Sequence, residues 1–232
     1  MVDEARYSLA EVDVWDRETL IAALKGARPL VLQGADLSNL DLTRLDFTGA
    51  QFERCILMET DFSNAILDST TWKSCRAGMA VFRRASVTEC RFQSSDLNNS
   101  KWSRARLTHT QFTGCKLSGA DLSDCSTLGL TFKDTILKNA YLSGVSFLKE
   151  YIDSLDFADA DLMGCDFRQA VMSEGCSLAN ARITDVRFQG ADLRGADLDG
   201  IRMSDPRQFK NALVTPYQAG QLIRGLGLRV ST

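Results

Sequence analysis

One histidine, seven cysteines and a recurring aspartate are the residues in this 232-residue sequence whose side chains suit acid–base, thiol or metal chemistry. His109 has no second histidine with which to share a metal ion, and proton transfer would also require an orienting partner and a pocket. The cysteines are odd in number and form no Cys-x-x-Cys pair, so neither a disulfide framework nor a zinc site is indicated. No glycine-rich phosphate loop or nucleophile elbow is present. We therefore predict no catalytic residue, no metal site and no cofactor, that is, a protein that is not an enzyme.

A five-residue repeat determines how these residues are positioned. A large apolar residue stands at every fifth position from 37 to 172, which is 28 positions, with only Ala77 and Thr127 as exceptions. After one inserted residue the register resumes at six further positions, from 178 to 203. We call these 34 apolar positions the centres. Period five does not hold one face of a helix, which has 3.6 residues per turn.

The residue two positions before each centre is small. It is Ala, Cys, Ser, Thr or Val at 28 of the 34 positions. In an extended segment residues i and i−2 point to the same side, so both point inward, while i−1 points outward. All seven cysteines occupy this inward position: Cys55, Cys75, Cys90, Cys115, Cys125, Cys165 and Cys176. The six exceptions are Leu40, Leu45, Leu130, Glu150, Leu155 and Ile201.

This arrangement predicts a coil that turns after every repeat, with parallel coils stacked about 4.8 Å apart. The inward thiols are then small hydrophobic groups with raised pKa values, and His109 lies at a corner facing water. The Asp that often stands at i−1 could be read as a metal ligand. Because it recurs along outer faces and Asp caps local backbone at turns, we interpret it as structural.

The repeat resembles that of the pentapeptide-repeat family, whose consensus is A(D/N)LXX. The resemblance covers residues 35–203 and implies an all-β fold, a right-handed quadrilateral parallel β-helix with four repeats per coil. At the strand spacing, that is about 8.5 coils and roughly 40 Å of length. The tripeptide Ala-Asp-Leu stands at 35–37, 120–122, 160–162, 191–193 and 196–198.

Both ends of a solenoid need a cap. We expect residues 1–34 to form an N-terminal cap with a helix over 14–25 that begins near Asp16. Residues 204–232 are expected to form a C-terminal cap, in which Thr215 begins a helix with Pro216 at its first position. A short apolar strand is expected to follow this helix.

The C-terminal segment is similar to the ends of the quinolone-resistance pentapeptide proteins and the mycobacterial fluoroquinolone-resistance protein, in which such a helix joins two rods. This resemblance rests on Asp205-Pro206-Arg207, Leu222, Leu226-Gly227 and Val230. It implies a homodimer through the C-terminus, whereas a cap without a partner chain is the alternative. The expected interface residues are Tyr217, Leu222, Ile223, Leu226, Leu228 and Val230.

The charge is nearly balanced overall but uneven along the chain. The 27 basic and 30 acidic residues give a net charge of −3, which does not favour a nucleic-acid partner. No apolar run is long enough for a membrane helix, and residues 1–16 do not resemble a signal peptide, so we expect a cytoplasmic protein with no membrane partner. The net charge is −5 over residues 35–71, +7 over 72–118 and −7 over 119–200.

The family resemblance implies a function. Quinolone-resistance members resemble duplex DNA in shape and negative charge, and they bind DNA gyrase or topoisomerase IV. A bacterial DNA mimic that protects a type II topoisomerase is therefore the first hypothesis, although the basic segment 72–118 does not fit a mimic along its whole length. A scaffold or adaptor for secretion, effector delivery or regulation is the second. The candidate acidic face comprises Asp153, Asp156, Asp159, Asp161, Asp166, Asp185, Asp192, Asp197 and Asp199.

One segment does not fit the repeat. Glu150 stands at an inward position, where an unpaired charge would be buried. We therefore predict that residues 147–156 bulge out as a loop, with Lys149, Glu150 and Tyr151 as possible partner contacts. A locally distorted coil is the alternative.

Overall fold

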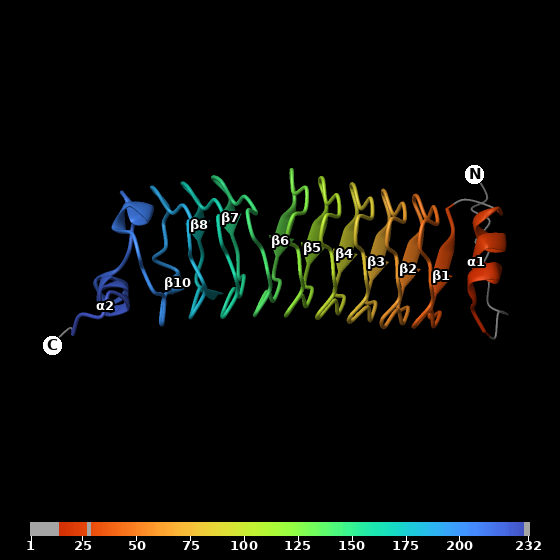
Figure 1. The fold of residues 1–232 in the computed structure, drawn as a ribbon, viewed down its shortest axis with the longest axis horizontal. Helices are drawn as coiled ribbons and strands as arrows, with labels where there is room; N and C mark the ends of the chain where they lie inside the picture. Colours follow the sequence, from red (N-terminus) through yellow and green to blue (C-terminus); the bar gives the residue numbers. More distant parts are fainter. Residues whose placement is uncertain (1–13, 27–28, 230–232) are drawn as a thin grey trace, which may run out of the picture.

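The computed structural model describes residues 14–26 and 29–229 and shows a parallel β-solenoid of about eight coils (Figure 1). Six strands form one parallel sheet in chain order, and four short strands form two further pairs, β7 with β8 and β9 with β10. The six strands are β1 (Val31–Gln33), β2 (Gln51–Glu53), β3 (Thr71–Lys73), β4 (Arg91–Gln93), β5 (Gln111–Thr113) and β6 (Thr131–Lys133). The shorter ones are β7 (Tyr151–Ile152), β8 (Val171–Met172), β9 (Cys176–Ser177) and β10 (Ala196–Asp197).

Each coil takes 20 residues, which is four repeats. Phe52 pairs with Trp72, and Trp72 pairs with Phe92. The inserted residue after the centre at 172 lengthens one coil to 21, so that Asp156 pairs with Ser177. We call the face that carries β1 to β8 the first face. The second, third and fourth faces follow along the chain and carry the pairs Ile56–Arg76, Asp61–Val81 and Ile66–Ser86.

The centres fill the axis of the rod. Phe82 and Trp102 stack with their ring centroids 3.9 Å apart, and the Phe52 and Trp72 rings stack at 4.1 Å. All four of these side chains are almost fully buried. A buried aromatic or aliphatic side chain stabilises a fold by about 1.5–3 kcal/mol, so this column is the main source of stability. The prediction that the centres point inward is confirmed.

The small inward residues also make a hydrogen bond that explains why Thr and Cys are common there. The Thr60 hydroxyl donates to the carbonyl of Leu37 at 2.8 Å, and the Cys75 thiol donates to the carbonyl of Phe52 at 3.3 Å. In each case the acceptor lies 23 residues earlier, at a centre of the preceding coil. A buried hydroxyl without such a partner would be destabilising, and the repeat supplies the partner at every coil.

The outward Asp at i−1 shapes the corner. The Asp61 carboxylate accepts a hydrogen bond from the backbone N–H of Ser63 at 2.8 Å, and Asp96 accepts from Asn98 in the same way. The residue two positions after the centre then adopts a left-handed conformation, for example Asn64 with φ of 59°. The interpretation of these aspartates as structural is confirmed.

Helices cover both ends of the rod. At the N-terminus α1 (Arg17–Leu24) begins at a capping box between Asp16 and Thr19, and it buries Leu20. The first coil begins with β1, a few residues earlier than residue 35. At the other end lie the 3-10 helix η1 (Pro206–Phe209) and α2 (Pro216–Gly225).

The last coil extends beyond the repeat. Phe209 stacks on Phe188 with ring centroids 4.9 Å apart, so it takes the place of a centre. The Gln218 amide then donates to the carbonyls of Leu193 and Ala196 and thereby caps the final coil. Leu228 lies outside any strand, so the structure does not bear out the expected terminal strand at that residue, and Val230 lies outside the described residues.

Residues 147–156 do not form the predicted loop. Phe147, Ile152 and Leu155 are buried as the repeat requires, and β7 lies within the segment. Glu150 is nevertheless exposed. Its side chain points outward, while the backbone of the segment stays in the coil. The segment is therefore a locally distorted coil.

Candidate partner-binding surface

The nine aspartates of the predicted acidic face are spread over all four faces of the rod. Asp153 and Asp192 lie on the first face, Asp161 and Asp185 on the third, and Asp166 on the fourth. The second face brings the other four together: Asp156, Asp159, Asp197 and Asp199.

Arginines from the next coil or the same corner neutralise most acids outside the second face. Asp161 pairs with Arg182 at 3.2 Å, and Asp192 pairs with Arg194 at 2.6 Å. Arg182 stands directly above Asp161 in the parallel register. A carboxylate bonded to a guanidinium presents little net charge to a partner, so these positions add little to a negative surface.

Asp166 has the most complete pairing. Its side chain is 6% exposed and contacts Arg168 at 2.8 Å and Arg187 at 3.0 Å. The hydrogen bonds from Arg168 lower the pKa of the Asp166 carboxyl, and the charge of Arg187 adds to this effect. Asp166 therefore holds two coils together and is poorly placed to meet a partner.

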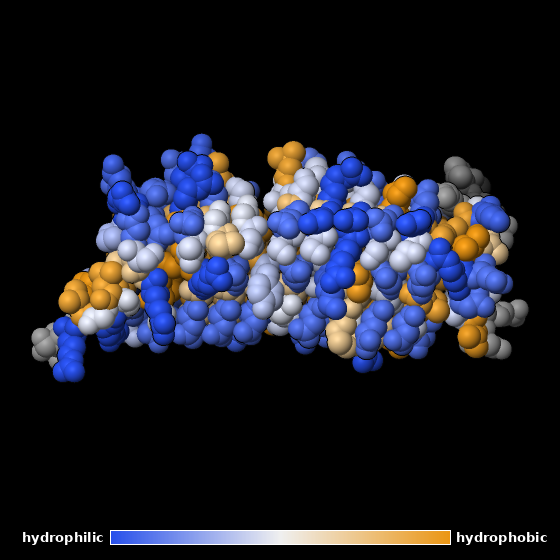
Figure 2. Space-filling view, viewed as in Figure 1, coloured by the Kyte–Doolittle hydropathy of each residue, from blue (hydrophilic) through white to orange (hydrophobic). Residues whose placement is uncertain are grey.

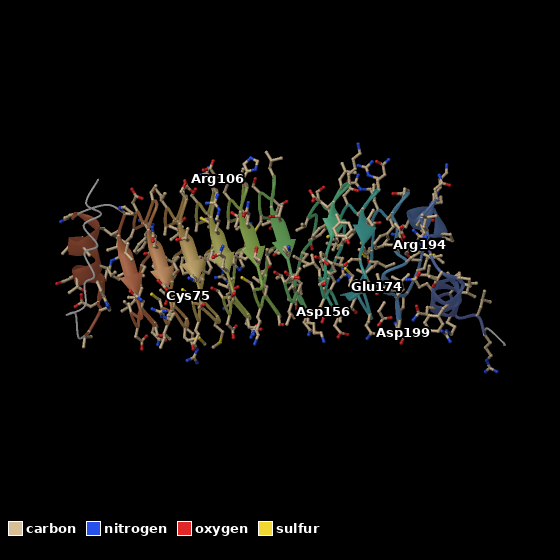
Figure 3. All side chains as sticks on the ribbon, turned by 180° about the vertical axis from the view of Figure 1, so that it is seen from behind. Cys75, Arg106, Asp156, Glu174, Arg194 and Asp199 are labelled. Carbon is tan, nitrogen blue, oxygen red and sulfur yellow. The ribbon has the colours of Figure 1, made fainter. Side chains whose placement is uncertain are left out.

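We define the acidic patch as Asp156, Asp159, Glu174, Asp197 and Asp199. Asp156 pairs with Lys138 at 3.3 Å, and no ion pair involves the other four carboxylates within residues 14–26 and 29–229. Asp159, Glu174, Asp197 and Asp199 are exposed. Figure 3 shows Asp156, Glu174 and Asp199 succeeding one another along the same side of the rod toward α2. Glu174, at the corner before the second face, is the member that the sequence analysis did not select.

The largest group of basic residues in segment 72–118 lies on a different face. Four of them stand on two adjacent coils of the third face: Arg83, Arg84, Lys101 and Arg104. None of these four forms an ion pair with a described residue. Because the acidic patch lies on the second face and closer to α2, the two charges are separated both around the rod and along it.

The C-terminal end of the rod is apolar. Tyr217, Ile223, Leu226 and Leu228 are 72%, 40%, 44% and 57% exposed. Figure 2 shows the hydrophobic surface over α2 at this end. Leu222, which the sequence analysis assigned to a dimer interface, is 7% exposed and packs into the rod's own core. It therefore caps its own chain and is not available to a second one.

The thiols are held inside the coils. Burial raises the pKa of the Cys90 thiol to about 11 and those of Cys125 and Cys165 to about 12. The neighbouring thiols of Cys55 and Cys75 interact in one column, which lowers the pKa of the Cys55 thiol and raises that of the Cys75 thiol. The prediction of a raised pKa is therefore wrong for Cys55, where the interaction with Cys75 outweighs the effect of burial.

The described part of the chain assembles no histidine-containing or metal-binding cluster. His109 is exposed at a corner, and its imidazole occupies the space that a side chain at Gly129 would need. Within the described part of the chain no three His, Cys, Asp or Glu side chains are grouped so that they could hold a metal ion. None of the helices in that part is both long and apolar enough to cross a bilayer.

Comparison with known proteins gives two matching family models. One, described as a pentapeptide repeat region, matches residues 45–122, and the other, described as pentapeptide repeats (8 copies), matches 31–57 and 156–200. Together they cover more than half of the chain. The quinolone resistance pentapeptide repeat protein QnrB96 from Scandinavium goeteborgense is 33% identical over 94 residues, which is 38% of this chain. The aligned part spans 44% of that relative's length.

Solved structures resemble the whole rod. Two trypsin-treated forms of QnrB1, a plasmid-mediated fluoroquinolone resistance protein, match with a TM-score of 0.65 at 26% and 24% identity. Each match covers 87% of this chain and 98% of the other. The fold is thus that of a known solenoid, and the sequence is similar to quinolone-resistance proteins over part of its length.

The environment of Asp166 predicts a pH-dependent contribution to stability. Because the folded-state pKa is lowered, the contribution is present above the unfolded pKa of about 3.9 and is lost as pH falls through the folded value. We expect Asp166→Asn to lower the free energy of unfolding at pH 7 by about 1–2 kcal/mol. Urea titrations should show this difference shrinking below about pH 4. Asp185→Asn is the control, because this exposed residue forms no ion pair with a described residue. An equal loss at pH 3 and pH 7 would contradict the assignment.

The burial of the thiols predicts selective alkylation. Cys125 is the one cysteine that is not fully buried, so iodoacetamide at pH 8 should modify it at least tenfold faster than Cys90 or Cys165. Peptide mass spectrometry measures the rates. Cys125→Ser should remove the fast phase, whereas equal rates at buried and partly buried thiols would show that the coils open globally instead.

Proposed function

Because this chain belongs to the pentapeptide-repeat family, we propose that it is a non-catalytic protein whose acidic patch binds a protein surface built for duplex DNA. The surface we propose is that of DNA gyrase or another type II topoisomerase, and the effect is protection of that enzyme against drugs or toxins. The similarity to QnrB96 and to QnrB1, which are quinolone-resistance proteins, supports this choice of partner.

The observation that carries the proposal is a set of exposed carboxylates on one face of a rigid rod that form no ion pair with any described residue. A DNA-binding surface presents Lys and Arg to phosphates. Asp159, Asp197 and Asp199 carry the same negative charge as DNA phosphates. Their positions are fixed, because each stands on a coil whose centres are buried. A protein that competes with DNA in this way needs no catalytic group and no bound nucleic acid.

A dimer through α2 would extend the negative surface. The exposed side chains of Tyr217, Ile223, Leu226 and Leu228 form an apolar end that a second copy would cover. The acidic patch lies on the coils next to α2, so two patches would flank the junction of such a dimer. This is the arrangement we propose for the form that meets the topoisomerase.

A scaffold or adaptor is the second candidate. The third-face cluster of Arg83, Arg84, Lys101 and Arg104 favours it, because a DNA-binding surface would repel these cations. In that case the rod would join an acidic partner on the third face to a different protein elsewhere.

A supercoiling assay tests the proposed partner. Purified gyrase inhibited by ciprofloxacin should recover activity when the protein is added at stoichiometric amounts. The triple variant Asp159→Asn, Asp197→Asn and Asp199→Asn should need at least a tenfold higher dose, because the unpaired negative charge of the patch is removed. The measurement is the dose that restores half of the supercoiled product.

The matched control removes three charges elsewhere. Glu59→Gln, Glu89→Gln and Asp185→Asn change exposed corner residues outside the patch, and this variant should stay within twofold of the unmodified protein. Lack of protection against gyrase and topoisomerase IV would favour the scaffold. An equal loss in both variants would show that total charge, and not the patch, matters.

The oligomeric state is tested by light scattering after size exclusion. We expect the mass of a dimer for the unmodified protein and of a monomer for Ile223→Glu with Leu226→Glu, since a charge cannot be buried in an apolar interface. Leu213→Glu, also at an exposed apolar position but outside α2, is the control. A monomeric unmodified protein would leave α2 as a cap only.

A further inference from the structure

The hydrogen bonds between coils are interrupted midway along the rod. The backbone N–H groups of Leu107 and His109 donate to the carbonyls of Ser126 and Leu128, both at 2.8 Å. One coil further, the equivalent bonds from Thr127 to Ser146 and from Gly129 to Leu148 are absent in the described chain. We call the interval between residues 124–134 and residues 143–153 the open seam.

The open seam affects one side of the rod. On the first face β6 pairs with β5 but not with β7, which starts a separate sheet. On the opposite side the coils stay bonded, through Leu117 to Ile136 at 2.8 Å and Leu137 to Asp156 at 2.8 Å. Figure 1 shows a wider interval between β6 and β7 than between the neighbouring strands β5 and β6.

Three departures from the repeat coincide at the open seam. Leu130 and Glu150 occupy successive positions in an inward column whose other members, apart from Leu30 at the N-terminal end of the rod, are small: Ala50, Thr70, Cys90, Thr110, Ala170 and Ala191. Thr127 stands in a column of centres that are otherwise Phe, Leu or Val. An oversized side chain, a charge and an underfilled centre together prevent the two coils from approaching to bonding distance. Phe132 and Cys125 are left only partly buried as a result.

The two rims of the open seam present complementary backbone groups. In the register of the other coils, N–H groups of residues 127 and 129 would face carbonyls of residues 146 and 148. An unpaired strand edge of this kind is a template for another strand. A peptide backbone in extended conformation can supply acceptors to one rim and donors to the other, which a small polar ligand cannot do along a whole strand.

The side chains at the rims define what such a strand would carry. Leu128, Leu148 and Tyr151 are 71%, 40% and 67% exposed, so alternate residues of an incoming strand would meet apolar surface. The rims carry four carboxylates and two ammonium groups, a net charge of −2, and none of them forms an ion pair with a described residue. These charged residues are Asp124, Lys133, Asp134, Lys149, Glu150 and Asp153.

We propose that the open seam is a docking site for an extended segment of a partner protein, apolar at alternate residues and carrying Lys or Arg between them, which inserts as an extra strand between the two coils. The bonded side of the rod acts as the hinge line that keeps the halves together. This site is separate from the acidic patch and does not depend on the identity of the partner that the patch binds.

A closed variant provides the test. Leu130→Thr with Glu150→Thr gives the column the residue type found at Thr70 and Thr110. Because inward threonines donate to carbonyls 23 residues earlier, the new hydroxyls would reach Leu107 and Thr127. Hydrogen exchange of the unmodified protein should show residues 127, 129, 146 and 151 exchanging at least tenfold faster than residues 107 and 109. The closed variant should slow them at least tenfold.

The probe is the blocked peptide Ac-Val-Lys-Val-Thr-Val-Lys-Val-NH2 with a fluorescent label, and its partner is the full-length protein. We expect saturable binding by fluorescence anisotropy and hydrogen-exchange protection confined to residues 124–134 and 143–153. The closed variant, and a peptide with alternate amides N-methylated, should each bind at least tenfold more weakly. Leu40→Thr, the same kind of change where the ladder is intact, should bind as the unmodified protein does.

Three results would overturn the proposal. One is the absence of saturable peptide binding, another is equal binding to the closed variant, and the third is slow exchange at residues 127, 129, 146 and 151 of the unmodified protein. Since no topoisomerase enters this experiment, its failure would leave the function proposed for the acidic patch standing, and failure of that function would not affect the result here.

Discussion

The close packing of one centre on the next along the axis is the interaction on which the rest of this molecule depends. The backbone hydrogen bonds between coils form where buried side chains let two coils approach, as with Trp72 between Phe52 and Phe92. Where Thr127, Leu130 and Glu150 change the side-chain volume and polarity, the bonds are missing although the backbone follows the same repeat. A single small centre such as Ala77 leaves the ladder intact, whereas three neighbouring departures coincide with its loss.

The same packing explains why the chemistry of this chain lies on its surface. An axis filled by Phe, Leu and Trp has no room for a substrate, and burial raises the pKa of thiols beside it such as Cys90. A partner protein can then contact only the outward side chains, but many of these already form structural hydrogen bonds and ion pairs. An aspartate that caps a corner and meets an arginine from the next coil, as Asp161 does, adds little free charge. The function we propose rests on the outward carboxylates and apolar groups that have no such partner among the described residues.

Much of the fold could be read from the repeat, and less of the site. The inward cysteines, the capping helix that begins after Asp16 and the corner role of aspartate followed from spacing and local chemistry. The location of the acidic face did not follow from the sequence pattern. A sum of charges along a segment does not show which residue stacks on each acid one coil away. That information was present in the sequence, since Arg182 stands one coil after Asp161. The absence of β-branched residues two positions after the centres was a second unused signal, because these positions are left-handed.

By itself the sequence determined the period, the inward and outward sides of the wall and the chemical character of the axis, because these depend on interactions within a few residues of the chain. Only the tertiary structure decided that Glu150 turns outward, that Leu222 caps its own rod and that the coils separate between residues 124–134 and 143–153. The physical reason is that each outcome depends on a balance between two free energies, that of burying a side chain and that of moving a neighbouring coil. That neighbour lies some 20 residues away in the chain but directly alongside in space.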